Sequence, residues 1–195
     1  MKQENEITVE VDLGLEEVKE LLEKNNFKLL QEYSINDIYM INKDYLEEKD
    51  KYKLLNNCLI LRNIITDKKN EKTLTYKYKE YDDNGDIIKQ NIFDSKIDDI
   101  DSMKKVLEAI NYEELIKLYD HLMVYGTDKD ELVVQIVNDK HIYIEIEEKC
   151  WFIDRVYKSI DELKNVITKI GIPIKNNDYF VKKVLVELDD RNKDK

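Results

Sequence analysis

Two glutamates in the second half of the chain are spaced as metal-binding carboxylates can be. Glu145 and Glu147 alternate with isoleucines in the segment 142–147, so they share one face of a predicted strand, roughly 7 Å apart along it. Mg²⁺ prefers carboxylate oxygens together with the phosphates of a substrate. The spacing therefore fits a site for Mg²⁺ or Mn²⁺. It fits an ordinary solvated sheet face as well, and both interpretations stand at this point.

Basic side chains on two predicted strands form a second candidate group. Arg62 lies in the apolar segment 58–65, whereas Lys77 and Lys79 share one face of the segment 73–81. Gathered in one place, such side chains could neutralise a polyphosphate, and a guanidinium would add bidentate contacts. In a chain with 32 basic residues they could equally be surface positions.

Histidine and cysteine chemistry is not indicated. The two histidines and two cysteines lie far apart in the sequence, whereas a zinc site needs more nitrogen or sulfur ligands at set spacing. No Ser-His-Asp arrangement can be inferred, and four glycines supply no phosphate-binding glycine motif. No catalytic residue is therefore assigned. Trp151 and Phe152 are predicted to pack in the core, although an aromatic ring there could also stack on a base.

The elements that would position these residues are mostly strands. Alternating or continuous apolar patterns predict strands over 6–13, 27–42, 58–65, 73–81, 86–93, 113–125, 132–137 and 142–147. Helical periodicity predicts helices over 15–25, 99–110 and 160–170. The segment 113–125 could also be a helix, 43–56 a short helix or a loop, and 178–188 a short helix or a strand. A hairpin turn is predicted at 82–85, and residues 189–195 read as a charged tail.

These elements predict an α+β protein with about eight, mostly antiparallel strands. Several strands pair an apolar face with a charged one. In an open sheet the charged face would meet water, whereas in a closed barrel it would line a polar tunnel. Periodicity alone does not choose between the two.

Composition narrows the class of partner. A chain of 195 residues fits one large domain better than two small ones, and its net charge of −11 argues against a nucleic acid as the main partner. A small anionic ligand in a locally basic pocket remains compatible with that charge. No apolar run approaches the 18 or so residues of a membrane helix. Because no signal peptide is evident and the two cysteines read as free thiols, we expect a cytoplasmic protein.

Several short motifs resemble, in order and spacing, those of the CYTH or triphosphate-tunnel family. That family includes class IV adenylyl cyclases, thiamine triphosphatases and inorganic triphosphatases. The matching segments are Glu6–Glu10, Cys58–Arg62, Leu74–Lys77, Tyr143–Glu147 and Asp178–Val181. The resemblance spans residues 5–188. It implies a single CYTH-like domain over 1–188, built as an eight-stranded antiparallel β-barrel with flanking helices.

The resemblance also implies a function and a site. It implies divalent-metal-dependent hydrolysis, or cyclisation, of a linear or nucleoside triphosphate inside the barrel. The implied phosphate-binding residues are Arg62, Lys77, Lys79 and Lys89, and the implied ligands of Mg²⁺ or Mn²⁺ are Glu145, Glu147, Glu6 and Glu10. The partner would be a small anionic triphosphate, with no nucleic acid and no membrane. A homodimer is compatible with this interpretation.

Departures from the family pattern support an alternative. Thr8, Glu10, Ile64, Asp120 and Leu122 stand where the family has charged residues, most of them basic. The chain could therefore be a degenerate barrel without triphosphatase activity that binds another ligand or a protein. Lysines elsewhere, such as Lys140, Lys182 or Lys183, could also replace the lost cations. A third interpretation is an unrelated open α+β sheet with no tunnel.

Overall fold

The computed structural model describes residues 5–81 and 87–193, without the side chains of 79, 81 and 87–90. The hairpin turn predicted at 82–85 lies outside these residues. The strands are β1 (Glu6–Glu10), β2 (Lys28–Asn42), β3 (Cys58–Ile65), β4 (Asn70–Tyr81), β5 (Ile87–Lys96), β6 (Tyr112–Gly126), β7 (Glu131–Val137) and β8 (His141–Glu147). The α-helices are α1 (Leu15–Lys24), α2 (Lys51–Asn56), α3 (Ile100–Ala109), α4 (Ile160–Ile170) and α5 (Lys183–Lys193). Two short 3₁₀ helices, η1 and η2, cover Lys43–Tyr45 and Lys175–Asn177.

The eight strands form one antiparallel sheet in the order β1-β8-β7-β6-β2-β3-β4-β5. This confirms the predicted α+β class and the eight antiparallel strands. Among the residues that the structure describes, strand pairing ends at β1 on one side and at β5 on the other. Closure into a barrel therefore stays a prediction.

Three ambiguous segments take definite structures. Residues 112–126 form strand β6, in which buried Leu118 and Leu122 alternate with exposed Lys117 and Tyr119 near its middle. The segment 43–56 divides into η1 and α2. Helix α5 continues to Lys193, through residues where the sequence suggests a charged tail. Ion pairs and a hydrogen bond from Arg191 to a backbone carbonyl hold this end of α5.

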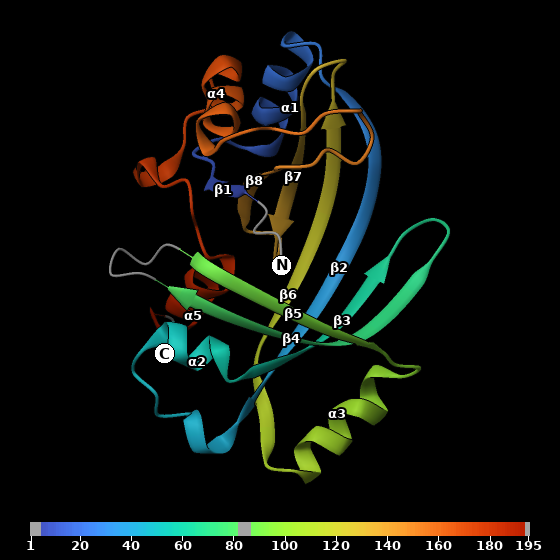
Figure 1. Ribbon diagram of the computed structural model, residues 1–195, viewed down its shortest axis with the longest axis vertical. Coiled ribbons are helices and arrows are strands. Elements are labelled where there is room, and N and C mark those ends of the chain that lie inside the picture. Colours follow the sequence, from blue (N-terminus) through green and yellow to red (C-terminus); the bar gives the residue numbers. More distant parts are fainter. Residues whose placement is uncertain (1–4, 82–86, 194–195) are drawn as a thin grey trace. The chain divides into compact units, whose positions relative to one another are not determined.

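The chain divides into two compact units, and strands β2 and β6 contribute to both. Unit 1 holds residues up to 33 together with 120–183. Helices α1 and α4 cover the apolar face of β1, β8 and β7 there (Figure 1). Ile7, Val9 and Ile144 on the strands and Val18 and Leu163 on the helices are fully buried. The opposite face of the same three strands carries the polar residues.

Helix α4 shows how local sequence fixes this layer. Its first turn begins where the Ser159 side chain accepts a hydrogen bond from the Glu162 amide, as the capping sequence indicates. It ends at Gly171, whose φ of +78° is a left-handed conformation that glycine adopts without a steric penalty. Between these two ends the buried residues of the helix, Leu163, Val166, Ile167 and Ile170, join the apolar core of the unit.

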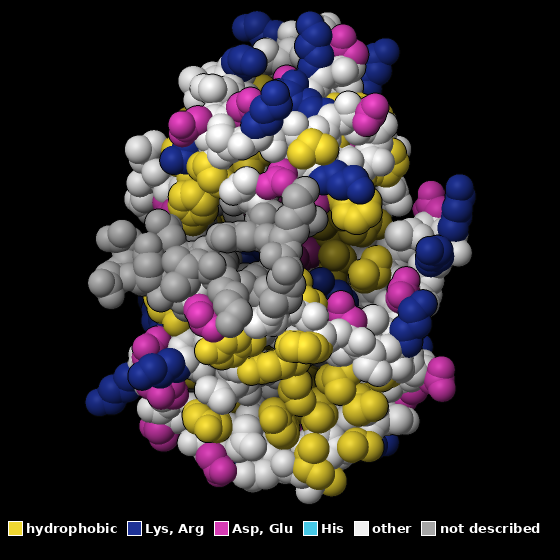
Figure 2. Space-filling view, in the orientation of Figure 1, with side chains coloured by type: hydrophobic (Ala, Val, Ile, Leu, Met, Phe, Trp, Pro, Cys, Tyr) yellow, Lys and Arg dark blue, Asp and Glu magenta, His cyan; other side chains and the backbone are white. Residues whose placement is uncertain are grey.

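Unit 2 holds residues 34–119 and 184 onward. Met40 and Leu61 from the strands and Leu107 from α3 form its small apolar cluster. The helical spacing of apolar residues in 99–110 predicts burial of Val106 and Ile110, and this is wrong, because both lie more than half exposed. The reason is that the buried side of α3 runs through Leu107. In Figure 2 apolar side chains gather on the visible face of this unit.

None of the helices in the described part of the chain is both long and apolar enough to cross a membrane.

Candidate functional site

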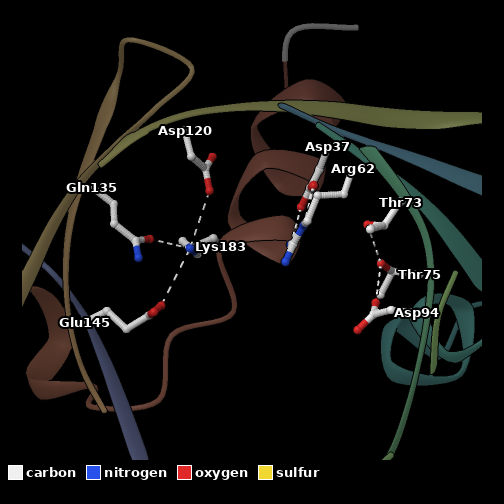
Figure 3. Close-up of polar contacts among 9 residues, drawn as sticks. All are labelled: Asp37, Arg62, Thr73, Thr75, Asp94, Asp120, Gln135, Glu145 and Lys183. Carbon is white, nitrogen blue, oxygen red and sulfur yellow. Dashed lines mark hydrogen bonds and ion pairs between the residues drawn. The ribbon is translucent and has the colours of Figure 1, made fainter. Parts of the chain in front are cut away.

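A lysine surrounded by acids and an amide lies on the polar face of unit 1. The Lys183 Nζ atom lies 3.5 Å from Asp120 Oδ2 and 3.7 Å from Glu145 Oε2. It also donates a hydrogen bond to the Gln135 side-chain oxygen (Figure 3). The three acceptors come from β6, β7 and β8. The Lys183 side chain is 22% exposed and the two carboxylates 8% and 16%, so the group is largely removed from water.

Strand register brings the three acceptors together. Gln135 pairs with Leu122, which is two residues from Asp120 and therefore on the same face of β6. Gln135 also pairs with Tyr143, two residues from Glu145 on β8. Alternation thus places all three acceptors on one face of neighbouring strands. In the sequence, Asp120 stands out only as a departure from the family pattern.

The segment before α5 places Lys183 next to the polar face of these strands. Thr8 on β1 donates its amide to the Tyr179 carbonyl at 3.0 Å, and the Val181 amide donates to the Thr8 carbonyl at 3.0 Å. A parallel bridge joins Thr8 to Phe180. Three residues beyond Phe180 the chain enters α5, whose first residue is Lys183. Backbone hydrogen bonds to Thr8 on β1 therefore hold the chain in place immediately before Lys183.

Glu10 lies at the other end of β1 in a separate ion-pair group. Its Oε1 atom lies 2.7 Å from Lys175 Nζ and 2.8 Å from His141 Nδ1. Burial raises the pKa of Glu10, but hydrogen bonds and charge from Lys175 and His141 outweigh it, so the pKa is lowered overall. The carboxylate is thus held ionised by side chains of its own unit.

Glu6 and Glu147 are direct register partners on β1 and β8. Side chains at such positions lie on the same side of a sheet, close enough to interact. Glu147 Oε2 accepts a hydrogen bond from the Trp151 indole at 2.7 Å, and Glu6 Oε1 accepts one from the Thr8 hydroxyl at 3.4 Å. The two carboxylates are therefore adjacent but already engaged with neutral donors.

The four glutamates do not fit a resident metal centre. They fall into three places: Glu145 at Lys183, Glu10 at Lys175, and the pair Glu6 and Glu147. Over residues 5–81 and 87–193, no group of three or more histidine, cysteine, aspartate and glutamate side chains is placed to hold a metal ion. Glu145 in particular turns a carboxylate oxygen toward an ammonium.

In unit 2, Arg62 makes a bidentate ion pair. Its Nε and Nη2 atoms donate to the two Asp37 carboxylate oxygens at 2.8 and 2.6 Å (Figure 3). Register places Asp37 opposite Arg62, and Arg62 opposite Thr73. Asp37 is 4% exposed. In the sequence, Asp37 stands out only as an acidic residue inside a predicted strand that contains several isoleucines.

A hydroxyl chain continues this polar face along β4. Thr73 and Thr75 hydroxyls lie 3.1 Å apart, and Thr75 donates to Asp94 Oδ1 at 2.6 Å (Figure 3). Lys77 is half-buried two residues further along the same strand, on the same face by alternation. The structure therefore groups Lys77 with Arg62 on one face of β3 and β4.

The remaining two predicted phosphate ligands have described backbones only. Lys79 follows Lys77 by two residues and pairs in register with Gln90. Lys89 pairs with Glu80, whereas Lys77 pairs with Ile92. The register position of Lys89 therefore belongs to the other face of the sheet from that of Lys77.

The aromatic residues after β8 are exposed, which corrects their predicted place in the core. Trp151 and Phe152 are 74% and 49% exposed. Their backbone amides donate to the two carboxylate oxygens of buried Glu131 at 2.7 and 2.8 Å. Nothing in the sequence indicates this role for Glu131. The contacts fix a bend that turns both rings outward.

A cavity of about 310 Å³ opens at the start of α1, within unit 1. Lys140 and Lys175 contribute to its lining. The Gly14 amide donates a hydrogen bond to the Glu17 carboxylate at 2.9 Å, so this amide already has a partner within the helix. Of the lysines suggested as replacement cations, Lys140 lies here and Lys183 lies in the acidic group described above.

Comparison with known proteins defines the fold. No family model and no curated protein sequence matches the chain. Among solved structures, the PH1819 protein of Pyrococcus horikoshii OT3 superposes with a TM-score of 0.65 at 19% identity, covering 96% of this chain and 99% of the other. HpAC1 of Hippeastrum, named as a candidate adenylyl cyclase with a dominant triphosphatase activity, gives 0.59 at 14% identity over 94% of both chains.

A third match comes from a different setting. A chain of the Schizosaccharomyces pombe Mediator head module gives a TM-score of 0.55 at 10% identity, covering 89% of this chain and 98% of the other. The chain thus has the fold of CYTH-like structures, which confirms the resemblance seen in its motifs, and it is a divergent example of that fold.

Proposed function

We propose that this protein binds a linear or nucleoside triphosphate and hydrolyses it. The observation that carries the proposal is the polar face of unit 2, where Arg62 and Lys77 lie on adjacent strands together with the Thr73 and Thr75 hydroxyls. Guanidinium and ammonium groups donate hydrogen bonds to phosphate oxygens and carry the charge opposite to theirs. The likeness in fold to HpAC1 over nearly the whole chain supports the same direction.

The role of each residue follows from its surroundings. Asp37 fixes the Arg62 guanidinium by two hydrogen bonds, so its orientation is set before a ligand arrives. Lys77, with Lys79 two positions on, would supply charge along β4. Fixed donors stabilise charge that develops on phosphoryl oxygens without reorganising. Mg²⁺ or Mn²⁺ would enter as the counter-ion of the triphosphate, since the glutamates do not form a resident site.

The test is phosphate release from inorganic triphosphate and from ATP, each with Mg²⁺ or Mn²⁺. We expect Lys77→Ala to lower the rate at least about tenfold, the effect of losing roughly 1.4 kcal/mol of transition-state stabilisation. Lys105→Ala, an exposed lysine on α3 of the same unit, is the matched control and should leave the rate unchanged. Equal rates for the two variants would refute the proposed role of Lys77.

A second candidate function is favoured by the ion pairs. Arg62 faces Asp37, Lys175 faces Glu10, and Lys183 faces Asp120 and Glu145. Carboxylates this close to the cations weaken the attraction between those cations and a polyphosphate. A degenerate, non-catalytic module that binds a less anionic ligand or a protein would suit such balanced charge. Folded protein that neither binds inorganic triphosphate in calorimetry nor releases phosphate would select this function.

A further inference from the structure

We infer that the Lys183 ammonium is the resident cation of the cluster formed by Asp120, Gln135 and Glu145, in the place that a divalent metal ion would occupy. Two carboxylate oxygens and an amide oxygen converge there from three adjacent strands. Such all-oxygen donors are the set that Mg²⁺ and Mn²⁺ prefer. An ammonium has three donors and no acceptor, so it can satisfy three oxygens at once.

The burial of the cluster supports this assignment. Two carboxylates that are 8% and 16% exposed would repel each other strongly without a cation between them. Lys183 supplies one positive charge to these two negative charges. An ion entering the same place would have to displace a side chain whose position is fixed by its own backbone.

A second observation comes from the helix that Lys183 begins. The first turn of α5 contains no acidic residue, and its first residue is this lysine. A positive charge at a helix N-terminus is disfavoured by the helix dipole. The acids of β6 and β8 account for a lysine at this position, because they lie within 4 Å of its Nζ atom.

The anchoring of the segment 179–181 to Thr8 makes the ammonium a built-in part of the site. Two backbone hydrogen bonds, each 3.0 Å, hold the chain alongside β1 immediately before Lys183. The cation therefore arrives with the fold, and its presence does not depend on the metal content of the solution. The protein is expected to need no divalent ion to complete this cluster.

The test titrates Mn²⁺ alone into the full chain by calorimetry, with thermal unfolding as a second readout. Lys183→Met keeps the length of the side chain but removes the charge, so the oxygens are left for an ion. We expect this variant to bind Mn²⁺ at least tenfold more tightly than the parent and to gain thermal stability with Mn²⁺. Adding Glu145→Gln to Lys183→Met should abolish the gain in Mn²⁺ affinity and the gain in thermal stability. Lys169→Met, at an exposed lysine on α4 of the same unit, is the matched control and should behave as the parent.

Glu145→Gln in the otherwise unchanged chain keeps the test decisive if Lys183→Met fails to fold. We expect the parent and this variant to show the same weak response to Mn²⁺. Tight, stoichiometric Mn²⁺ binding by the parent that Glu145→Gln removes would overturn the inference. A folded Lys183→Met variant that binds Mn²⁺ no more tightly than the parent would also overturn it. Because no triphosphate is present, these outcomes are independent of the proposed hydrolysis.

Discussion

Replacing Arg62 and replacing Asp37 should destabilise unit 2 by different amounts. Asp37 is 4% exposed, whereas the Arg62 side chain is 23% exposed. Arg62→Met would leave a carboxylate almost without access to water. Breaking a buried pair in this way costs about 3–5 kcal/mol, and we expect the lower end, about 3 kcal/mol, because the pair is not fully dry. Asp37→Leu leaves a guanidinium that can hydrate, so we expect about 1.5 kcal/mol.

The double variant makes the reasoning refutable. Replacing both partners by apolar side chains removes the buried charge altogether, so the double variant should lose about 2 kcal/mol less than the sum of the single losses. Urea unfolding followed by circular dichroism at 222 nm measures all four proteins. Additivity within about 0.5 kcal/mol would refute the coupling. A larger loss for Asp37→Leu than for Arg62→Met would refute the argument from burial.

Three further predictions concern other parts of the chain. Since Lys175 and His141 lower the pKa of Glu10, its ionised form stabilises the fold above pH 4.5, the ordinary value of a free glutamate, and this contribution is lost as the pH falls through the lowered folded value. The stability difference between the parent and Glu10→Gln should therefore shrink below pH 4.5 in urea titrations, and a constant difference would contradict this. Gly171→Ala meets no atom within 4 Å but keeps a left-handed φ, so it should cost about 1 kcal/mol in thermal unfolding. Burial raises the pKa of the Cys58 thiol to about 12, so iodoacetamide at pH 8 should leave it unmodified by mass spectrometry until the protein unfolds.

The regular elements could be predicted because their causes are local. Alternation of apolar and polar residues marks β8, and the Ser159 cap with Gly171 marks both ends of α4. The order of the strands in the sheet could not be predicted in this way. It depends on pairing between segments far apart, such as β1 with β8.

The candidate site was predictable only in part for the same reason. Glu145 and Arg62 stand out by type and spacing, but their partners do not. Asp37 lies 25 residues from Arg62, and Lys183 lies 48 residues from the glutamine that it contacts. The sequence suggested an ion between carboxylates. It contained no local signal that a lysine from the start of α5 would take that place.

The outward bend after β8 has an optical consequence. Trp151 is the only tryptophan of the chain, so its emission reports a single place in the molecule. Its indole is 74% exposed and donates its one hydrogen bond to Glu147. A cation captured by the Glu6 and Glu147 pair would take away that acceptor and change the emission. A cation captured beside Glu145 would leave the acceptor in place, so fluorescence and calorimetry together would tell the two locations apart.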